Sequence, residues 1–270
     1  MKRNCYNIII VGATHGHETL GVHVWEQLSR TSRVRQHARF LVGNPRAYEK
    51  RCQFIDADLN RIFPGDANST LYEEHRAAEL VPQLRDATVI DIHATGTIDN
   101  PHEEAMAITV RDDMQTRALV RAACPPRALL MRYRAAGALI AHARCGIALE
   151  YGKSDDKAAQ DMVRTAVERI VASLCAQNHN DTADAEKSAA QCEYVPLYEV
   201  YDVVTRPPGE WVIAPTVHNW VCVHKGDTIA QCTKTGNVLR AKEDFIPILF
   251  GENRYTTIFG FCARPTMENV

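Results

Sequence analysis

Residues 6–18 read YNIIIVGATHGHE, and this stretch carries both a fold signal and a chemical signal. Tyr6 to Val11 is a short apolar run rich in β-branched residues, which is typical of a buried strand, and Gly12 to Gly16 is a turn signal. The segment that follows, Glu18 to Ser29, spaces its apolar residues as a helix with one buried face does. A buried strand, a turn and a helix in this order indicate the beginning of an α/β fold.

The same alternation continues through the first two thirds of the chain. We expect further strands at Phe40–Val42, Thr88–His93, Ala105–Val110 and Gly146–Glu150. We expect further helices at Glu73–Leu84, interrupted by Pro82, at Gln115–Ala123 and at Lys157–Cys175. Alternating strands and helices predict an α/β layer structure with a largely parallel sheet that helices flank.

The character of the sequence changes near residue 192. Residues 176–192 are polar and small, which is typical of a linker. Short β-rich runs follow, separated by Pro-Pro-Gly, Lys-Gly-Asp and Thr-Gly-Asn turns, and they lie at Leu197–Val204, Trp211–Ile213, Trp220–Val223 and Phe245–Phe250. We therefore expect an α/β domain at 1–192 and a smaller β-rich domain at 193–270.

Composition excludes several classes of protein. The 270 residues carry 31 Lys and Arg against 33 Asp and Glu, and the net charge of −2 argues against a nucleic-acid-binding surface. The apolar runs, such as Ile8–Val11, are far shorter than the roughly 18 residues that span a membrane. The nine cysteines are scattered, without a Cys-x-x-Cys pair, and the N-terminus shows no signal peptide. We expect a soluble cytoplasmic protein with reduced thiols.

Two histidines and a glutamate at expected strand ends form a candidate metal site. His15 and Glu18 are three positions apart, so a turn that opens into a helix brings both side chains to one side. His93 ends another expected strand, and ligands gather at the carboxyl ends of strands in α/β sheets. Two histidines and a glutamate are a common ligand set for catalytic zinc. From spacing alone, a polar residue at a helix start and a buried core histidine remain the alternatives.

Glu150 ends an apolar strand, where a buried charge is costly unless the protein uses it. A metal-dependent hydrolase needs a carboxylate beside the metal that takes a proton from water and passes it to the leaving group. Glu150 is therefore a candidate general base. A solvated carboxylate at the end of a strand remains the alternative.

With these residues in view, the sequence resembles the aspartoacylase and succinylglutamate desuccinylase family, a branch of the zinc-carboxypeptidase-like hydrolases. The resemblance covers nearly the whole chain, and the matching motifs follow in the family's order with similar spacing. They are Gly12–Glu18 (Gly-x-x-His-Gly-x-Glu), Asp58–Arg61 (Asp-Leu-Asn-Arg), Asp91–His93 (Asp-x-His), Glu150–Gly152 (Glu-x-Gly) and the segment Gly251–Tyr255.

The resemblance implies one zinc ion per chain, held by His15, Glu18 and His93, with Glu150 as the catalytic general base. It also implies substrate contacts from Asn60, Arg61, Glu150 and Tyr255. Tyr255 would reach in from the β-rich domain, which would cover the active site. Arginine offers a planar pair of donors that matches a carboxylate, so Arg61 suits a substrate acid group.

The activity that the resemblance implies is zinc-dependent hydrolysis of an N-acyl amino acid, a small molecule, to a carboxylate and a free amino acid. The alternatives are a succinyl-amino-acid desuccinylase, a C-terminal peptidase, and a non-catalytic module that binds zinc or a small ligand. The presence of Glu150 beside the three metal ligands argues against a non-catalytic module, because a binding module needs no general base.

The chain departs from the family where relatives carry arginines. Gln53 stands near the place of an arginine ahead of Phe54-Ile55-Asp56, and Ile140 near the place of another ahead of the catalytic glutamate. With Arg61 as the remaining cation, we expect a substrate with a single α-carboxylate, and N-acetylaspartate to be a poor one. The competing hypothesis is that Arg51 or Arg144 supplies a second cation. The acyl group, the amino acid, the native metal and the oligomeric state, a homo-oligomer included, stay open.

Overall fold

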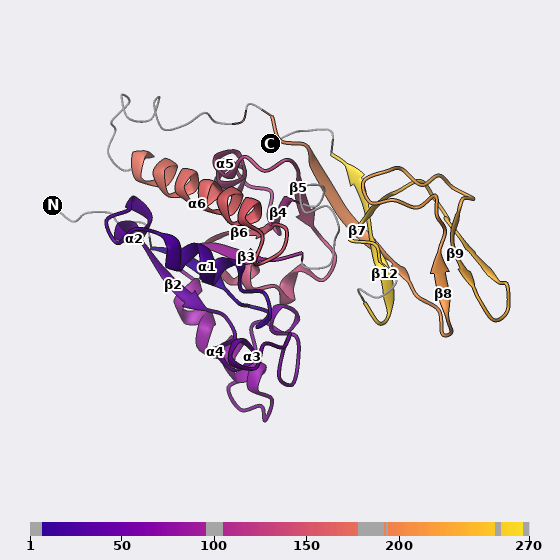
Figure 1. Cartoon of the computed structure of the whole chain (residues 1–270), viewed down its shortest axis with the longest axis horizontal. Helices are drawn as coiled ribbons and strands as arrows, with labels where there is room; N and C mark the ends of the chain where they lie inside the picture. Colours follow the sequence, from indigo (N-terminus) through magenta and orange to yellow (C-terminus); the bar gives the residue numbers. More distant parts are fainter. Residues whose placement is uncertain (1–6, 96–104, 178–191, 193, 252–254, 267–269) are drawn as a thin grey trace. The chain divides into compact units, whose positions relative to one another are not determined.

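The computed structural model describes residues 7–95, 105–177, 192, 194–251, 255–266 and 270 (Figure 1). The chain divides into two compact units. The first unit consists of Met1–Leu130, Arg134–Leu197 and Glu268–Val270, and the second unit of Met131–Tyr133 and Tyr198–Met267.

Strands and helices alternate along the first unit. Its strands are β1 (Ile8–Gly12), β2 (Ala38–Val42), β3 (Thr88–His93), β4 (Met106–Thr109), β5 (Ala128–Met131) and β6 (Cys145–Glu150). Its α-helices are α1 (Leu20–Gln27), α2 (Arg33–His37), α3 (Pro45–Lys50), α4 (Tyr72–Leu84), α5 (Met114–Ala123) and α6 (Lys157–Gln177). Three short 3₁₀ helices are η1 (Leu59–Arg61), η2 (Ala135–Gly137) and η3 (Leu139–His142).

The sheet of the first unit has the strand order β5-β4-β6-β3-β1-β2. Neighbouring strands are parallel except for β4 and β6, which are antiparallel. Because β1, β3 and β6 run in the same direction, their carboxyl ends meet at one edge of the sheet. The register places Gly12 beside Ile92, and His93 beside Glu150. The predicted, largely parallel sheet is confirmed, and this edge carries the candidate site.

Helices cover both faces of this sheet, because the side chains of each buried strand alternate between two cores. Ile8 and Ile10 of β1 belong to the core that α1, α5 and α6 complete. Ile9 and Val11 belong to the second core, to which α4 contributes Leu80. The predicted α/β class is confirmed. None of the helices in the described ranges combines the length and the apolar character that crossing a membrane requires.

The second unit is built from antiparallel strands. They are β7 (Leu197–Thr205), β8 (Trp211–Ile213), β9 (Thr228–Cys232), β10 (Val238–Arg240), β11 (Ile246–Ile248) and β12 (Ile258–Pro265). Here β12 pairs with β11 on one side and β7 on the other, and β9 lies between β8 and β10. Trp211, Val223, Phe245 and Phe259 are buried in the core of this unit. The β-rich C-terminal part of the predicted fold is confirmed.

Three local expectations were wrong. Pro82 does not interrupt α4, because it lies near the end of the helix, where a missing N–H removes a single hydrogen bond. Residues 220–223 form no strand: Val223 makes only an isolated bridge with Phe245, and Trp220 has a φ of 69°. The predicted linker at 176–192 begins inside α6, which continues to Gln177, and its residues 178–191 lie outside the described residues.

One pair of cysteines departs from the expectation of reduced thiols. Cys124, which caps the end of α5, forms a disulfide with Cys192, and the two Cα atoms are 5.4 Å apart. The partners are separated by 68 residues, so no local cysteine pattern could reveal the bond. Among the described residues, six further cysteines are free thiols.

Candidate metal centre and active site

A turn after β1, held by backbone hydrogen bonds, positions the first two candidate ligands. The backbone N–H of Glu18 donates to the carbonyl of His15 over 3.0 Å, and Gly16 N–H donates to the carbonyl of Gln53 over 3.2 Å. A side chain at Gly16 is excluded, because a Cβ there would lie 2.0 Å from the carbonyl carbon of Ala47. The tight turn places the His15 and Glu18 side chains on one side of the chain, as the spacing predicts.

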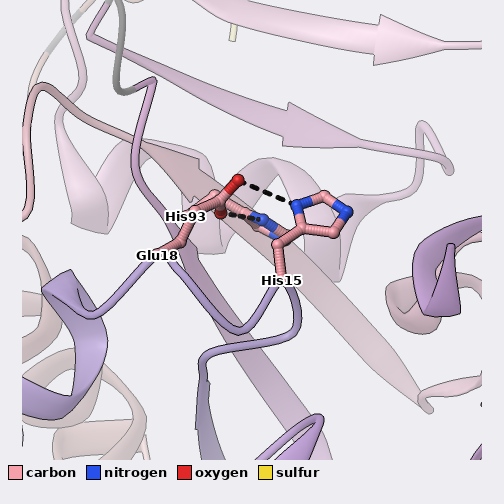
Figure 2. Close-up of side chains that lie close together, drawn as sticks. All are labelled: His15, Glu18 and His93. Carbon is pink, nitrogen blue, oxygen red and sulfur yellow. Dashed lines mark hydrogen bonds and ion pairs between the residues drawn. The ribbon is translucent and has the colours of Figure 1, made fainter. Parts of the chain in front are cut away.

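The structure brings His15, Glu18 and His93 together (Figure 2). Glu18 Oε1 lies 2.8 Å from Nδ1 of His15, and Glu18 Oε2 lies 2.8 Å from Nδ1 of His93. One ligand atom from each residue lies within 4.8 Å of the other two. His15 and His93 are buried, and the Glu18 side chain is 12% exposed. Two imidazole nitrogens and a carboxylate thus converge at a buried point on the carboxyl edge of the sheet.

Two aspartates hold the opposite nitrogen of each histidine ring. Asp58 Oδ1 lies 3.0 Å from Nε2 of His15, and Asp91 Oδ2 lies 2.8 Å from Nε2 of His93. The hydroxyl of Thr14 donates to the other oxygen of Asp91 over 2.8 Å. Carboxylates behind histidine ligands orient the rings and raise their basicity in metal sites. Both Nδ1 atoms are therefore held facing Glu18.

No role for these two aspartates was predicted from the sequence. A signal existed for Asp91, because residues two apart in a strand share a face, and Asp91 and His93 are such a pair. Asp58 gave no such signal, because 43 residues separate it from His15.

The substitution Asp91→Asn tests the role of this aspartate. The amide keeps the size of the side chain and its acceptor for Thr14, but it presents an N–H₂ donor to Nε2 of His93. The ring then carries its proton on Nδ1, where a metal needs a lone pair. We expect the zinc affinity, measured by competition with a chromogenic chelator, to fall about 10- to 100-fold. The exposed Asp86→Asn is the control, and equal affinities of the two variants would contradict the role.

Four carboxylates surround the two histidines and shift their pKa values. Burial alone would lower the pKa of His15, but the Glu18 charge and hydrogen bonds to Asp58 and Glu18 outweigh it and raise the pKa to about 9. Burial is likewise outweighed at His93, where the charges of Asp91, Glu150 and Glu18 raise the pKa. Burial would raise the pKa of Glu18, yet the two histidines lower it. Negative charge is in excess here, which suits a divalent cation.

Metal uptake is expected to release protons, because the raised pKa values of both histidines favour their protonated forms and a metal needs them neutral. Affinity for zinc should therefore rise as the pH approaches the His15 pKa of about 9. Isothermal titration with Zn²⁺ at pH 7, in two buffers of different ionisation enthalpy, should give enthalpies that differ by roughly one to two protons per ion. Identical enthalpies in both buffers would contradict the protonated state.

Glu150 lies beside this cluster. It ends β6 and stands in register with His93 on the parallel neighbour β3. Register partners in adjacent strands share a face of the sheet, so both side chains project to the same side. The Glu150 charge is one of the causes that raise the pKa of His93. Its side chain is half-buried, in a position where a carboxylate can serve a reaction next to the histidines.

Asn60 and Arg61 lie in η1, which begins directly after Asp58. The Asp58 side chain accepts from the backbone N–H of Asn60 over 2.9 Å and so joins this segment to His15. The side-chain oxygen of Asn60 accepts from the backbone N–H of Leu139 over 2.8 Å, which ties η1 to η3. Arg61 is exposed, and its charge helps to lower the pKa of Asp58 against the effect of burial. The segment is thus attached to the histidine cluster through Asp58.

A buried glutamate holds the loop that leads into Asp58. The Glu73 carboxylate, on α4, accepts hydrogen bonds from the backbone N–H groups of residues 55–57 at 2.6, 2.9 and 3.2 Å. The side-chain amide of Asn44 donates to it as well, over 3.0 Å. These bonds outweigh burial and lower the pKa of Glu73, so the carboxylate is ionised. This role of Glu73 was not predicted from the sequence, because nothing in the helical pattern marks the residue.

Arg51 and Arg144, the two candidates for a second substrate-binding cation, lie in different surroundings. Arg144 donates to the hydroxyl of Thr88 over 3.2 Å. Thr88 begins β3, and five residues of strand, roughly 16 Å, separate it from His93 at the other end. The hypothesis that Arg144 supplies a second cation is therefore wrong. The guanidinium of Arg51 lies 4.7 Å from the centre of the Tyr48 ring.

The neutral residues at the family's arginine positions also differ from each other. Gln53 contacts the turn of the histidine cluster through its backbone carbonyl, which accepts from Gly16, and its side chain is exposed. Ile140 is buried in η3 and contributes to the core that α4 covers.

Tyr255 belongs to the second unit. Its ring packs edge-to-face on Phe261 of β12, with ring centres 5.7 Å apart. The preceding residues 252–254 of the segment Gly251–Tyr255 lie outside the described residues.

Sequence relatives match segments of this chain. A segment of 85 residues is 40% identical to a probable aspartoacylase of Prochlorococcus marinus (strain MIT 9312) and covers 28% of each chain. A segment of 102 residues is 32% identical to a probable aspartoacylase of Nostoc, covering 33% of this chain and 35% of that protein. The matched segments thus span about a third of these relatives or less.

Solved structures share the fold over nearly the whole chain. Murine aminoacylase 3 superposes with a TM-score of 0.75 at 18% identity, covering 98% of this chain and 97% of its own. Succinylglutamate desuccinylase from Vibrio parahaemolyticus superposes with a TM-score of 0.70 at 16% identity, covering 98% and 83%. The profile of the succinylglutamate desuccinylase/aspartoacylase catalytic domain matches residues 4–176. The chain therefore belongs to the succinylglutamate desuccinylase/aspartoacylase family of hydrolases.

Proposed function

We propose that this protein is a zinc-dependent amidohydrolase that cleaves an N-acyl amino acid to a carboxylate and a free amino acid. The observation that carries the proposal is the buried His15–Glu18–His93 group with Glu150 in register beside His93. A metal-binding module needs the first three residues only, whereas a hydrolase also needs a carboxylate next to them.

The donor set fits zinc. Two imidazole nitrogens and one carboxylate leave a fourth tetrahedral position for water or substrate, as catalytic zinc sites do. The hydrogen bonds that Asp58 and Asp91 accept from the Nε2 atoms keep both Nδ1 atoms aimed at the proposed ion. When bound, zinc would polarise the acyl carbonyl and lower the pKa of an attacking water toward about 7.

The chain's own groups carry the remaining steps. A carboxylate oxygen of Glu150 takes the proton of the attacking water and then delivers it to the leaving amide nitrogen. Arg61 binds the α-carboxylate of the substrate through its planar donor pair, and Asn60 fixes the loop from which Arg61 projects.

A hydrolysis screen tests the function. The zinc-loaded protein is incubated with N-acetyl, N-succinyl and N-formyl amino acids and with short peptides, and the released amine is measured. Release from N-acetyl or N-formyl substrates supports the proposal. A strict preference for N-succinyl substrates indicates a desuccinylase, and release from peptides alone indicates a C-terminal peptidase. No release from any substrate by protein that holds zinc would overturn the enzymatic assignment in favour of a binding module.

Gln53 leads us to expect a preference for substrates with a single carboxylate. The backbone of Gln53 adjoins the histidine turn, and its exposed side-chain amide can donate a hydrogen bond but cannot balance a charge. The kcat/KM for neutral N-acetyl amino acids should therefore exceed that for N-acetylaspartate. Gln53→Arg should raise the value for N-acetylaspartate, whereas the exposed Gln36→Arg should leave it unchanged. A preference for N-acetylaspartate that Arg51→Ala abolishes would instead assign the second cation to Arg51.

A further inference from the structure

The second unit carries another cluster of metal-binding side chains, at Cys222, His224 and Asp244. The Cys222 Sγ atom lies 4.0 Å from Nδ1 of His224, and the same nitrogen lies 3.2 Å from Oδ2 of Asp244. Ligand atoms from the three residues lie within 4.8 Å of one another, and all three residues are exposed. Nothing in the proposed hydrolysis uses them.

The backbone pairing explains why these side chains meet. Val223 and Phe245 form an antiparallel bridge, in which each N–H donates to the other's carbonyl, at 2.8 and 3.0 Å. Both of their side chains are buried in the core of the second unit. Side chains alternate along extended chains, so the flanking residues Cys222, His224 and Asp244 project to the opposite, solvent-facing side. The fold thus places three ligands side by side.

The surrounding turn fixes the ligands before any ion arrives. One oxygen of Asp244 accepts from the backbone N–H of Lys225 over 2.8 Å, which leaves the other oxygen toward His224. The backbone N–H of His224 donates to the side chain of Asp227 over 2.9 Å, and Gly226 supplies the positive φ of 93° that this turn requires.

A Cys–His–Asp group also suggests a nucleophilic triad, but the geometry argues against one. In a triad the nucleophile contacts one imidazole nitrogen and the carboxylate contacts the other. Here the thiol and the carboxylate both approach Nδ1 of His224. The thiol, the carboxylate and Nδ1 of His224 therefore converge on one point, as the ligands of a metal ion do.

We propose that Cys222, His224 and Asp244 bind a divalent transition-metal ion of the zinc class at the surface of the second unit. Zinc accepts thiolate, imidazole and carboxylate ligands in tetrahedral sites, with solvent able to fill the fourth position. Bond lengths of about 2.0 to 2.3 Å hold sulfur and nitrogen roughly 3.6 Å apart, and nitrogen and oxygen roughly 3.4 Å apart. The observed sulfur–nitrogen separation of 4.0 Å and nitrogen–oxygen separation of 3.2 Å differ from these values by only a few tenths of an ångström. Calcium and magnesium prefer oxygen ligands and suit this set poorly.

Cobalt substitution distinguishes this site from the His15–Glu18–His93 group, because only the site in the second unit contains sulfur. The full chain, freed of metal by a chelator, is titrated with Co²⁺ under reducing conditions and followed by absorption. We expect a near-ultraviolet thiolate-to-cobalt charge-transfer band that Cys222→Ser and His224→Ala both abolish. Cys52→Ser, which removes a free thiol in the first unit, should retain the band. Absence of the band from the wild type, or its persistence in both variants, would overturn the proposal.

Zinc content gives an independent readout. After equilibrium dialysis against Zn²⁺, we expect about two ions per chain in the wild type and about one in His224→Ala. Hydrolysis by His224→Ala should equal that of the wild type. If the His15–Glu18–His93 group failed to hold metal, the zinc content per chain would fall while the charge-transfer band remained. The failure of one site can therefore be distinguished from the failure of the other. An unchanged zinc content in His224→Ala would refute the site.

Discussion

Glu150→Gln is expected to keep the fold and the zinc of the first unit while its kcat falls about 10²–10⁴-fold, the usual contribution of a general base. The amide has the shape of the carboxylate but cannot accept a proton from water at neutral pH. Since Glu150 stands in register with His93, the loss should appear in kcat on the best substrate of the screen, with the metal content of the protein measured in parallel.

The matched control is Glu168→Gln, an exposed glutamate of α6. It makes the same chemical change without contact to the proposed centre, and its kcat should equal that of the wild type. If Glu150→Gln also turned over at the wild-type rate, with zinc bound, Glu150 would have no part in proton transfer.

His15→Ala and His93→Ala are each expected to reduce the zinc held in the first unit to near zero and hydrolysis to background. Each substitution removes one of three protein ligands and also leaves nearby carboxylates without their partner. His93 is fully enclosed, and breaking such a buried pair costs about 3–5 kcal/mol of folding stability. His15→Ala should therefore retain the fold better, and circular dichroism checks this.

These measurements are best made in a Cys222→Ser background, so that the zinc count reports the first unit only. His37→Ala, an exposed histidine of α2, is the control and should keep one zinc ion per chain. Unchanged metal content in both His15→Ala and His93→Ala would refute the ligand assignment.

The strands whose bounds were predicted most accurately are those whose own residue types favour a strand. Thr88–His93 and Trp211–Ile213 are strands with the expected bounds, because β-branched or aromatic residues are bounded there by turn signals. β12, at Ile258–Pro265, was missed, since Gly260 weakens its strand pattern and pairing with β7 and β11 determines its conformation. Residues 220–223 show the converse, because a strand-like run there lacks a partner along its length.

The candidate site divides in the same way. His15 and Glu18 are three residues apart, and His93 ends a recognisable strand, so a local pattern and a family resemblance sufficed to select them. Asp58 and Glu73 act across 43 and 16 to 18 residues, and no periodicity marks such contacts. Arg144 was wrongly considered as a second cation because it precedes β6, the strand that Glu150 ends. The strand begins at the edge of the sheet opposite the histidines, and Arg144 lies there beside Thr88.

The hydrogen bonds from residues 55–57 to Glu73 determine which residues of this loop can change during evolution. The backbone N–H groups of residues 55–57 all donate to the Glu73 carboxylate, and every residue but proline provides such a group. The Asp56 side chain also accepts from the backbone N–H of Tyr72 over 2.8 Å, so it is tied to the start of α4. The side chains of Ile55 and Ala57 can therefore be exchanged by mutation, for any residue but proline, while the course of the chain into Asp58 is preserved. Such a loop lets its sequence diverge while Asp58 keeps its place behind His15.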